Sequence, residues 1–439
     1  MFAYRTHVPC AALAVLVAIS AAVPARAGGP DFTSMTLLAT RPYAKDGVAH
    51  NEAPLYEQLS LLTAGSSVGP IDDMRLVARA WGRADLGDPL IGSRAQGDID
   101  VAYLEGRLLE RRLLLRLGRQ MLTEGAARNT QLDGLTASGQ VWRGLGVEAY
   151  GGAPVVARFG SGGIGNRGDA LTGARIFWRQ SYDAEIGVSY VYAVDSGLVA
   201  RSDAAVDGWW QPIRTVTLGA TAQWSLYEAR LAEGRGLVQW QPIKIVQLTA
   251  DVQRTAPDLF LARNSIFAVF SQQRRDEAGG EAALRLGSRF SAYLDYHHVW
   301  FKDQNAATLA VPTLLDAGSG ERAGGKLSWH LGPQRETTVG CEVRLLEEPD
   351  NGFKQARIWW MRSWDWGLRA TVDADAYWLN HSINGQRRSL AANATVGYPF
   401  APGWDGMVGG SLGFTPFLER RFELIARASY RFDFAGRKQ

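Results

Sequence analysis

Charged side chains recur on alternate positions in several segments of this sequence. Asp373 and Asp375 are two residues apart, and Arg427 and Arg431 are four apart. Because successive residues of a β-strand point to opposite faces, these spacings place the charges of each segment on one face of a sheet. Guanidinium groups bind carboxylates in bidentate fashion, so such a face could bind an anionic solute. The residues predicted to share this face and to line a lumen are Arg175, Arg179, Arg285, Arg344, Arg357, Arg369, Arg427, Arg431, Asp373 and Asp375.

Two interpretations of this charged face stay open. In the first, charges of both signs pair across neighbouring strands and form an ordinary solvated wall. In the second, the arginines form a track for an anionic sugar polymer. The two differ in whether the arginines are free to bind a solute.

A histidine and an aspartate lie close together in the segment from 290 to 301. Asp295 and His297 are two residues apart on one face of a predicted strand, so their side chains could touch. No serine stands near them in a recognisable nucleophile setting. His298 falls on the other face, between Tyr296 and Trp300, which fits an aromatic girdle. We therefore predict no catalytic residue and no enzymatic activity.

The run from Gly163 to Gly168 has the glycine spacing of a dinucleotide-binding fingerprint. That fingerprint needs a helix directly after it, whose N-terminus faces the phosphates, but residues 171–179 alternate as a strand. A flexible loop without a cofactor is the prediction. No spacing of histidines, cysteines or carboxylates matches a metal site, so no metal is expected either. Cys341 alternates with Val339 and Val343 on an apolar face and is predicted to face lipid.

Strict alternation also predicts the elements that carry these side chains. From Trp366 to Trp378 one face is wholly apolar and has Trp at both ends. A water-soluble sandwich also alternates, but an apolar face flanked by interfacial aromatics is typical of outer-membrane barrels. The segment from Phe422 to Phe434 repeats the pattern, and it resembles the terminal signal that the barrel insertion machinery recognises. These patterns predict an all-β fold, a transmembrane antiparallel up-and-down β-barrel.

Connections of two kinds separate the predicted strands. Trp210-Gln211-Pro212-Ile213 recurs at Trp240-Gln241-Pro242-Ile243, which fits a repeating hairpin with Pro at the strand end. Short turns are predicted at Ser181–Asp183, Ser288–Arg289, Gly332–Arg335, Ser363–Asp365 and Ala401–Gly403, and long links at Gly160–Asp169, Arg254–Gly280 and Lys302–Arg322. Short turns on one rim and long loops on the other are typical of outer-membrane barrels. Counting back from the C-terminus to Arg112 predicts about 18 strands, or about 20 if Met74–Leu86 and Asp98–Leu109 are included. We predict 18, in a range of roughly 16 to 20, enough for an aqueous lumen.

The link from Arg254 to Gly280 has a further predicted role. It contains Phe260, Phe267 and Phe270 in a segment of loop length. Exposing apolar rings to water is unfavourable, so we predict that this link folds inward and narrows the pore.

The N-terminus predicts export. Arg5 precedes an apolar run from Ala11 to Val23, which ends in Ala25-Arg26-Ala27, the pattern of a cleaved signal peptide. The predicted organisation is a signal peptide over 1–27, an N-terminal periplasmic segment over 28–54 and the outer-membrane barrel over 55–439, in contact with outer-membrane lipid. The chain has 47 basic and 44 acidic residues, and this balance argues against nucleic acid as a partner.

A short motif adds a resemblance. At Leu115-Arg116-Leu117-Gly118-Arg119-Gln120, followed by Leu132-Asp133-Gly134, the chain resembles porin-like outer-membrane barrels. The resemblance is strongest to the alginate export family and to the exopolysaccharide-export barrels of myxobacteria. It implies export of an anionic polysaccharide together with a periplasmic polysaccharide export protein. A general or substrate-selective diffusion porin for small solutes is the alternative, and an outer-membrane enzyme or adhesin barrel is a further one.

Overall fold

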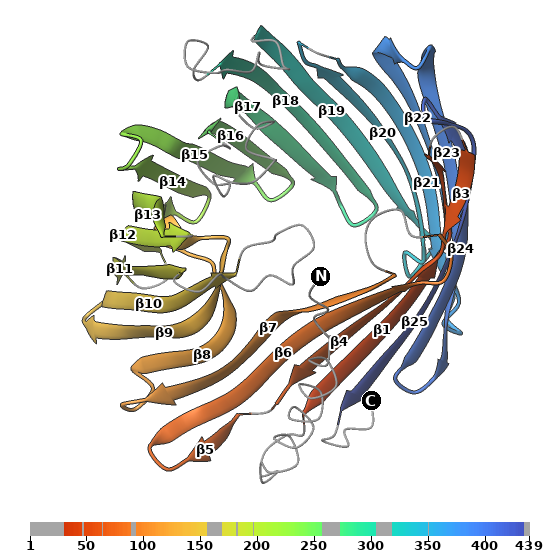
Figure 1. Ribbon diagram of the computed structural model, residues 1–439. Coiled ribbons are helices and arrows are strands. Elements are labelled where there is room, and N and C mark those ends of the chain that lie inside the picture. Colours follow the sequence, from red (N-terminus) through yellow and green to blue (C-terminus); the bar gives the residue numbers. More distant parts are fainter. Residues whose placement is uncertain are drawn as a thin grey trace.

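The protein is a closed antiparallel β-barrel (Figure 1). The computed structural model describes residues 30–45, 48–63, 65–88, 94–155, 169–180, 183–195, 197–256, 273–303, 318–349 and 351–433. Within these residues the sheet has 23 strands, one of which is the three-residue β5 (Ser66–Val68) paired with β6, so 22 strands form the wall. Figure 1 shows the strands following one another around the ring in sequence order. No helix in the described part of the chain is long and apolar enough to cross a membrane.

The strands of the wall are mostly 10 to 16 residues long, enough for tilted strands to span a bilayer. They are β1 (Asp31–Ala39), β4 (Pro54–Leu62), β6 (Ile71–Asp85), β7 (Ala95–Leu108), β8 (Leu113–Leu122), β9 (Thr130–Trp142), β10 (Leu145–Val155), β11 (Ala170–Gln180), β12 (Ala184–Asp195), β13 (Leu198–Ile213), β14 (Val216–Ser225), β15 (Arg230–Ile243), β16 (Val246–Thr255), β17 (Gln273–Leu286), β18 (Phe290–Asp303), β19 (Gly318–Leu331), β20 (Thr337–Glu347), β21 (Phe353–Ser363), β22 (Arg369–Ile383), β23 (Gln386–Ala401), β24 (Trp404–Thr415) and β25 (Leu418–Asp433). A separate hairpin is formed by β2 (Arg41–Lys45) and β3 (Val48–Glu52).

The first and last strands close the barrel. β1 pairs antiparallel with β25 from Asp31 opposite Asp433 to Ala39 opposite Ile425. β1 also pairs with β4, and β4 pairs with β6, so the ring continues into the strands that follow. Closure satisfies the backbone donors and acceptors that an open edge strand would leave unpaired.

The two faces of the wall differ as the alternation predicts. On β22 the apolar residues Val372 and Trp378 are exposed on the outward face, while Asp373 and Asp375 face the lumen. Cys341 is also exposed on the outward face of β20. The outward face is therefore the apolar one, and the lumen-facing side carries the charges.

The two rims also differ. We call the rim where β1 begins and β25 ends the terminal rim, and the opposite one the loop rim. The strands on either side of the five predicted short turns meet at the terminal rim, namely β11 and β12, β17 and β18, β19 and β20, β21 and β22, and β23 and β24. The strands that precede the longer connections, β6, β10, β16 and β18, end at the loop rim.

The predicted strand number was too low. The count of 18 matches the strands from β8 to β25, and the optional segments Met74–Leu86 and Asp98–Leu109 correspond to β6 and β7. The two strands that no count included are β1 and β4, which complete the wall. The same finding moves the start of the barrel, because β1 lies within residues 28–54, which were predicted to be a periplasmic segment. Apolar alternation does not predict β1 and β4, because the polar residues Ser34, Thr36 and Glu57 lie on their outward face.

The predicted link from Arg254 to Gly280 was too long. β16 continues to Thr255 and β17 begins at Gln273, so the last eight residues of that link belong to the wall. Phe260, Phe267 and Phe270 lie outside the described residues, as do the signal peptide and the run from Gly163 to Gly168.

Candidate functional site

A short loop between β8 and β9 folds into the barrel. It contains a 3₁₀ turn, η1 (Gly125–Ala127), whose three residues are all buried. They pack against apolar side chains on the lumen-facing side of β9 to β13, namely Leu132, Tyr150, Leu171, Val191, Ala193 and Ala205. Because these positions would otherwise expose apolar surface to a water-filled interior, the loop covers them. This contact places η1 inside the lumen.

Hydrogen bonds fix the loop in this position. The backbone N–H of Ala126 donates to Ser189 Oγ at 2.7 Å, and the Arg201 guanidinium donates to the carbonyl of Ala126. Gly125 has φ +60°, and a Cβ added there would lie 2.5 Å from Ser189 Oγ. Glycine is therefore required at this position both for its backbone conformation and for space.

Arg175 joins the loop to the wall. Its side chain is 3% exposed, and its Nη1 lies 2.6 Å from Glu124 Oε2 of the loop. The same guanidinium pairs with Glu185 of β12 at 2.7 Å and with Asp207 of β13. Three carboxylates therefore share one buried cation. Arg175 has the lumen-facing position that the sequence predicts, but its donors are occupied by these partners and it holds the loop.

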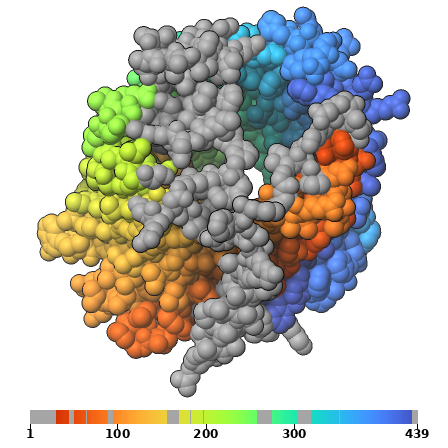
Figure 2. Space-filling view, in the orientation of Figure 1, coloured from red at the N-terminus to blue at the C-terminus, as the bar shows by residue number. Residues whose placement is uncertain are grey.

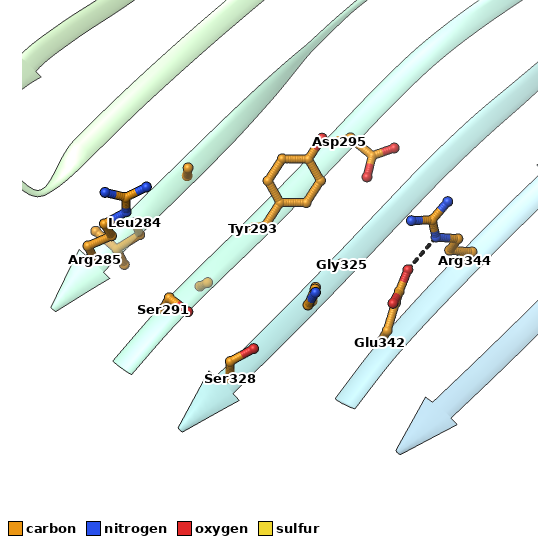
Figure 3. Close-up of a pocket in the computed structure, with 12 residues that line it drawn as sticks. Leu284, Arg285, Ser291, Tyr293, Asp295, Gly325, Ser328, Glu342 and Arg344 are labelled. Atoms are coloured by element: carbon orange, nitrogen blue, oxygen red, sulfur yellow. Dashed lines mark hydrogen bonds and ion pairs between the residues drawn. The ribbon is translucent and has the colours of Figure 1, made fainter. Parts of the chain in front are cut away.

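A second group of polar residues lines the wall on β17 to β20 (Figure 3). They surround a hollow of about 490 Å³. In Figure 3, Tyr293 and Asp295 stand side by side on β18, and Glu342 forms an ion pair with Arg344 on β20. Arg285 borders the same hollow; its side chain is exposed and has no ion-pair or hydrogen-bond partner among the residues the structure describes. In the space-filling view, the barrel is hollowed between the strands coloured teal to blue and those coloured orange to yellow (Figure 2).

The remaining predicted lumen residues are paired with one another or with nearby carboxylates. Arg357 Nε lies 2.7 Å from Asp373, and Asp375 accepts a hydrogen bond of 2.8 Å from Gln355. The other pairs are Arg179 with Glu185, Arg369 with Asp405, Arg427 with Asp405 and Arg431 with Asp31. The strand register places all of these side chains on the lumen-facing side. Within the described ranges these arginines are therefore paired with carboxylates and do not form a free track.

His297 is buried in the lumen-facing wall. It is 1% exposed, and its Nε2 lies 3.0 Å from Asp251 Oδ1 on β16. Gly279 of β17, between them, leaves room for the ring, since a Cβ there would lie 2.5 Å from His297 Cδ2. The partner of His297 is thus Asp251 and not the predicted Asp295. His298 faces outward and packs against Trp300 with ring centroids 4.5 Å apart, and no cluster of three metal-ligating side chains occurs in the described ranges.

The two halves of the motif from Leu115 to Gln120 and from Leu132 to Gly134 lie side by side on β8 and β9. Arg119 forms a bidentate pair with Asp133, with distances of 2.7 and 2.8 Å. Arg119 also donates to Asp98 at 3.0 Å. The motif therefore fixes the two strands that carry the inward loop.

Sequence reasoning missed the loop and its anchors, Glu124, Ser189 and Arg201. A signal was present in Val191, which is apolar on the face that otherwise carries Glu185 and Ser189. An apolar residue on a lumen-facing position indicates that something covers it.

Comparison with known proteins supports the fold. No protein-family model and no curated protein matches this chain. The chain is similar to the translocation pore of the P pilus usher PapC, with a TM-score of 0.50 and 10% identity over 91% of this chain and 99% of that one. It is also similar to the outer membrane protein OpdK of Pseudomonas aeruginosa, with a TM-score of 0.46 and 11% identity over 93% and 99% of the two chains. A third similar structure is OccD3 (OpdP) of Pseudomonas aeruginosa, with a TM-score of 0.45 and 9% identity over 93% of this chain and 92% of that one. At these identities the likeness is one of fold, and the resemblance to the alginate export family finds no support.

Proposed function

We propose that this chain is an outer-membrane channel through which small polar solutes diffuse. The observation that carries this proposal is the closed barrel of 22 strands with an apolar outward face and a charged lumen. Closed barrels are the form in which β-strands can span a bilayer, because every backbone group finds a partner. A barrel with this many strands encloses a wide interior. One neighbour of similar fold, the PapC usher, is itself described as a translocation pore.

The lumen favours diffusion of small solutes over export of a polymer. Seven of the eight arginines predicted to form a track are paired with carboxylates on the wall or on the inward loop. A polymer would have to displace these pairs one after another. A small ion or solute can instead pass along a wall whose charges already satisfy each other. The periplasmic export protein and the anionic polysaccharide remain predictions from resemblance.

Selectivity would arise where the loop narrows the lumen. The cluster of Arg175, Glu124, Glu185 and Asp207 places more acidic than basic groups beside η1. The hollow on β17 to β20 instead contains the unpaired Arg285 and the ammonium group of Lys326, which lies 5.2 Å from the centroid of the Trp359 ring. A permeating solute would therefore meet regions of opposite charge.

Single-channel recording in planar bilayers tests the proposal. We expect steady conductance that an anionic oligosaccharide does not block, because the arginines are paired. Concentration-dependent block by that oligosaccharide would favour the export function. Absence of conductance from protein shown to be folded and inserted would reject the channel and favour an enzyme or adhesin barrel.

A further inference from the structure

The outward face of the barrel differs between its two rims. At the terminal rim, aromatic rings contact one another in sequence on β21 to β23 and again on β23 to β25. The first run joins Trp360, Trp364, Trp366 and Tyr398, and the second joins Phe400, Trp404, Tyr430 and Phe432. Tryptophan and tyrosine rings are typical of the level where a barrel meets the membrane–water interface.

At the loop rim the same strands carry a row of cations. Lys354 of β21 lies directly opposite Trp378 of β22, and Trp378 lies directly opposite Arg388 of β23. Residues opposite each other in an antiparallel pair face the same side, and Trp378 is 43% exposed on the outward face. The three side chains therefore form one outward row, with a cation on each side of an interfacial ring. Neighbouring strands lie about 4.8 Å apart, so the backbones of Lys354 and Arg388 are separated by roughly 10 Å.

These cations lie just beyond the apolar part of the wall. Leu390, two residues from Arg388 on the same face, is exposed, as is Ile358 on the face of Lys354. Two residues of a strand span about 7 Å, so Arg388 lies that far beyond the apolar band in the direction of the loops. Charges at this depth are at the level of lipid headgroups and no longer within the hydrocarbon layer.

Neither cation is paired with an acidic side chain of the described residues. Lys354 and Arg388 are exposed and have no ion-pair partner in the described part of the chain. Arg388 also borders a rim hollow of about 630 Å³ together with Arg387 and Phe414. Glu419 lines this hollow as well and would disfavour an anion on its own side. The available donors are thus those of the outward row.

We propose that Lys354 and Arg388 bind the phosphorylated headgroup of a lipid in the outer leaflet, with Trp378 packed against the lipid between them. Guanidinium and ammonium groups are the usual partners of phosphate oxygens, and cations at a membrane surface attract anionic lipids. On β21 to β23, the aromatic cluster at the terminal rim and the row of Lys354, Trp378 and Arg388 at the loop rim would then face the two leaflets of the membrane. The inference rests on the outer-membrane location proposed above, and it does not depend on conduction through the lumen.

Native mass spectrometry of the purified full chain with diphosphorylated lipid A tests this site. We expect the Lys354→Gln/Arg388→Gln double variant to bind at least about tenfold more weakly than wild type. Arg362→Gln is the matched control, because Arg362 is an exposed outward cation of β21 that lies over Trp364, with its Cζ 5.1 Å from the ring centroid, at the opposite rim. That control should bind within about twofold of wild type.

Two further binding measurements identify which part of the lipid is recognised. Wild type and the double variant should bind chemically dephosphorylated lipid A equally well. Inorganic phosphate at millimolar concentration should not displace the lipid, because it lacks the acyl chains that hold the headgroup at the rim.

Equal binding of lipid A to wild type and the double variant would overturn the proposal, and so would full displacement by inorganic phosphate. Heat-modifiable mobility on gels checks that each variant is folded, and Arg388→Gln alone serves if the double variant does not fold. Conductance in phosphatidylcholine bilayers separates this site from the channel, since the double variant should conduct as wild type does.

Discussion

Arg175 Nη1 lies 2.6 Å from Glu124 Oε2, and this ion pair joins the loop between β8 and β9 to the lumen-facing wall. The loop carries η1, so the pair holds a buried segment inside a barrel that would otherwise be wider at this level. The other two partners of Arg175, Glu185 and Asp207, belong to neighbouring strands. The position of the loop is therefore coupled to the pairing of β11, β12 and β13.

Glu124→Gln removes the charge that ties the loop to Arg175 and leaves the wall pairs intact. We expect a larger single-channel conductance, because the loop loses its charged anchor and samples positions away from the wall. Glu110→Gln, an exposed acid in the turn on the terminal rim, is the control and should leave conductance unchanged. Identical conductance for Glu124→Gln and wild type would show that the ion pair does not restrict the lumen.

Arg175→Met tests the same cluster through stability. Removing the cation leaves Glu124, Glu185 and Asp207 facing one another without a shared partner. Loss of one partner from a buried ionic network costs about 3–5 kcal/mol, so the midpoint of urea unfolding in detergent should fall clearly. A midpoint within error of wild type would mean that solvent already screens these carboxylates.

Gly125→Ala should destabilise the barrel by about 1–3 kcal/mol. Residue 125 has a left-handed backbone conformation that alanine disfavours, and the added Cβ would clash with Ser189. Gly197→Ala provides a matched control, because Gly197 has φ +79° and nothing within 4 Å of an added Cβ. The difference between the two variants in unfolding free energy isolates the contact with Ser189. Equal losses would show that backbone strain alone accounts for the effect.

Arg285→Gln should shift the reversal potential in a salt gradient toward cation preference. The Arg285 guanidinium has no partner among the described residues, so its charge is available to permeating anions. Stability should change by less than about 0.5 kcal/mol, as for an exposed surface substitution. Arg285→Lys keeps the charge and should retain the selectivity of wild type; a shift as large as that of the glutamine variant would assign the effect to shape.

Thr36→Val should destabilise the barrel, whereas Ser34→Ala/Thr36→Val/Glu57→Leu should leave it at least as stable as wild type. Ser34 Oγ donates to Glu57 Oε1 at 2.5 Å, and Thr36 donates to the other carboxylate oxygen. Thr36 lies opposite Ala428, between the exposed Phe422 and Phe432 of β25, so the carboxylate is on the outward face well inside the apolar band. Removing one donor from a charged acceptor there costs about 1–3 kcal/mol, while an all-apolar replacement leaves nothing unsatisfied. The unfolding free energy of each variant can be measured in lipid vesicles. A large loss of stability in the triple variant would show that the unsatisfied carboxylate is not the cause of the effect.

The alternation of residue types was sufficient to predict most of the wall. Residues such as Val372 and Asp373 follow from a period of two, because the pleat sends neighbours to opposite faces and lipid and water accept different side chains. The same rule located the short turns and the outward position of Cys341. It failed where the outward face is polar, at Ser34, Thr36 and Glu57, and so β1 and β4 were not counted.

The candidate site was predicted only as a set of lumen-facing charges. Position along a strand gives the side on which Arg357 or Arg175 lies, but its partner belongs to another strand or to a loop. Asp251, and not the neighbouring Asp295, bonds to His297 because the strand register places it across Gly279. Which arginine is free and which is buried is likewise a property of the assembled wall.

The sequence by itself determined that strands form, which face of each is apolar and which rim has the short turns, because these depend on interactions within a few residues. The tertiary structure decided the closure of the barrel, the inward position of η1 and the pairing of its charges. Arg431 meets Asp31 across 400 residues of sequence, with Nη2 at 2.9 Å from Oδ2. Contacts at such separation leave no local pattern, because only the closed ring brings the two strands together.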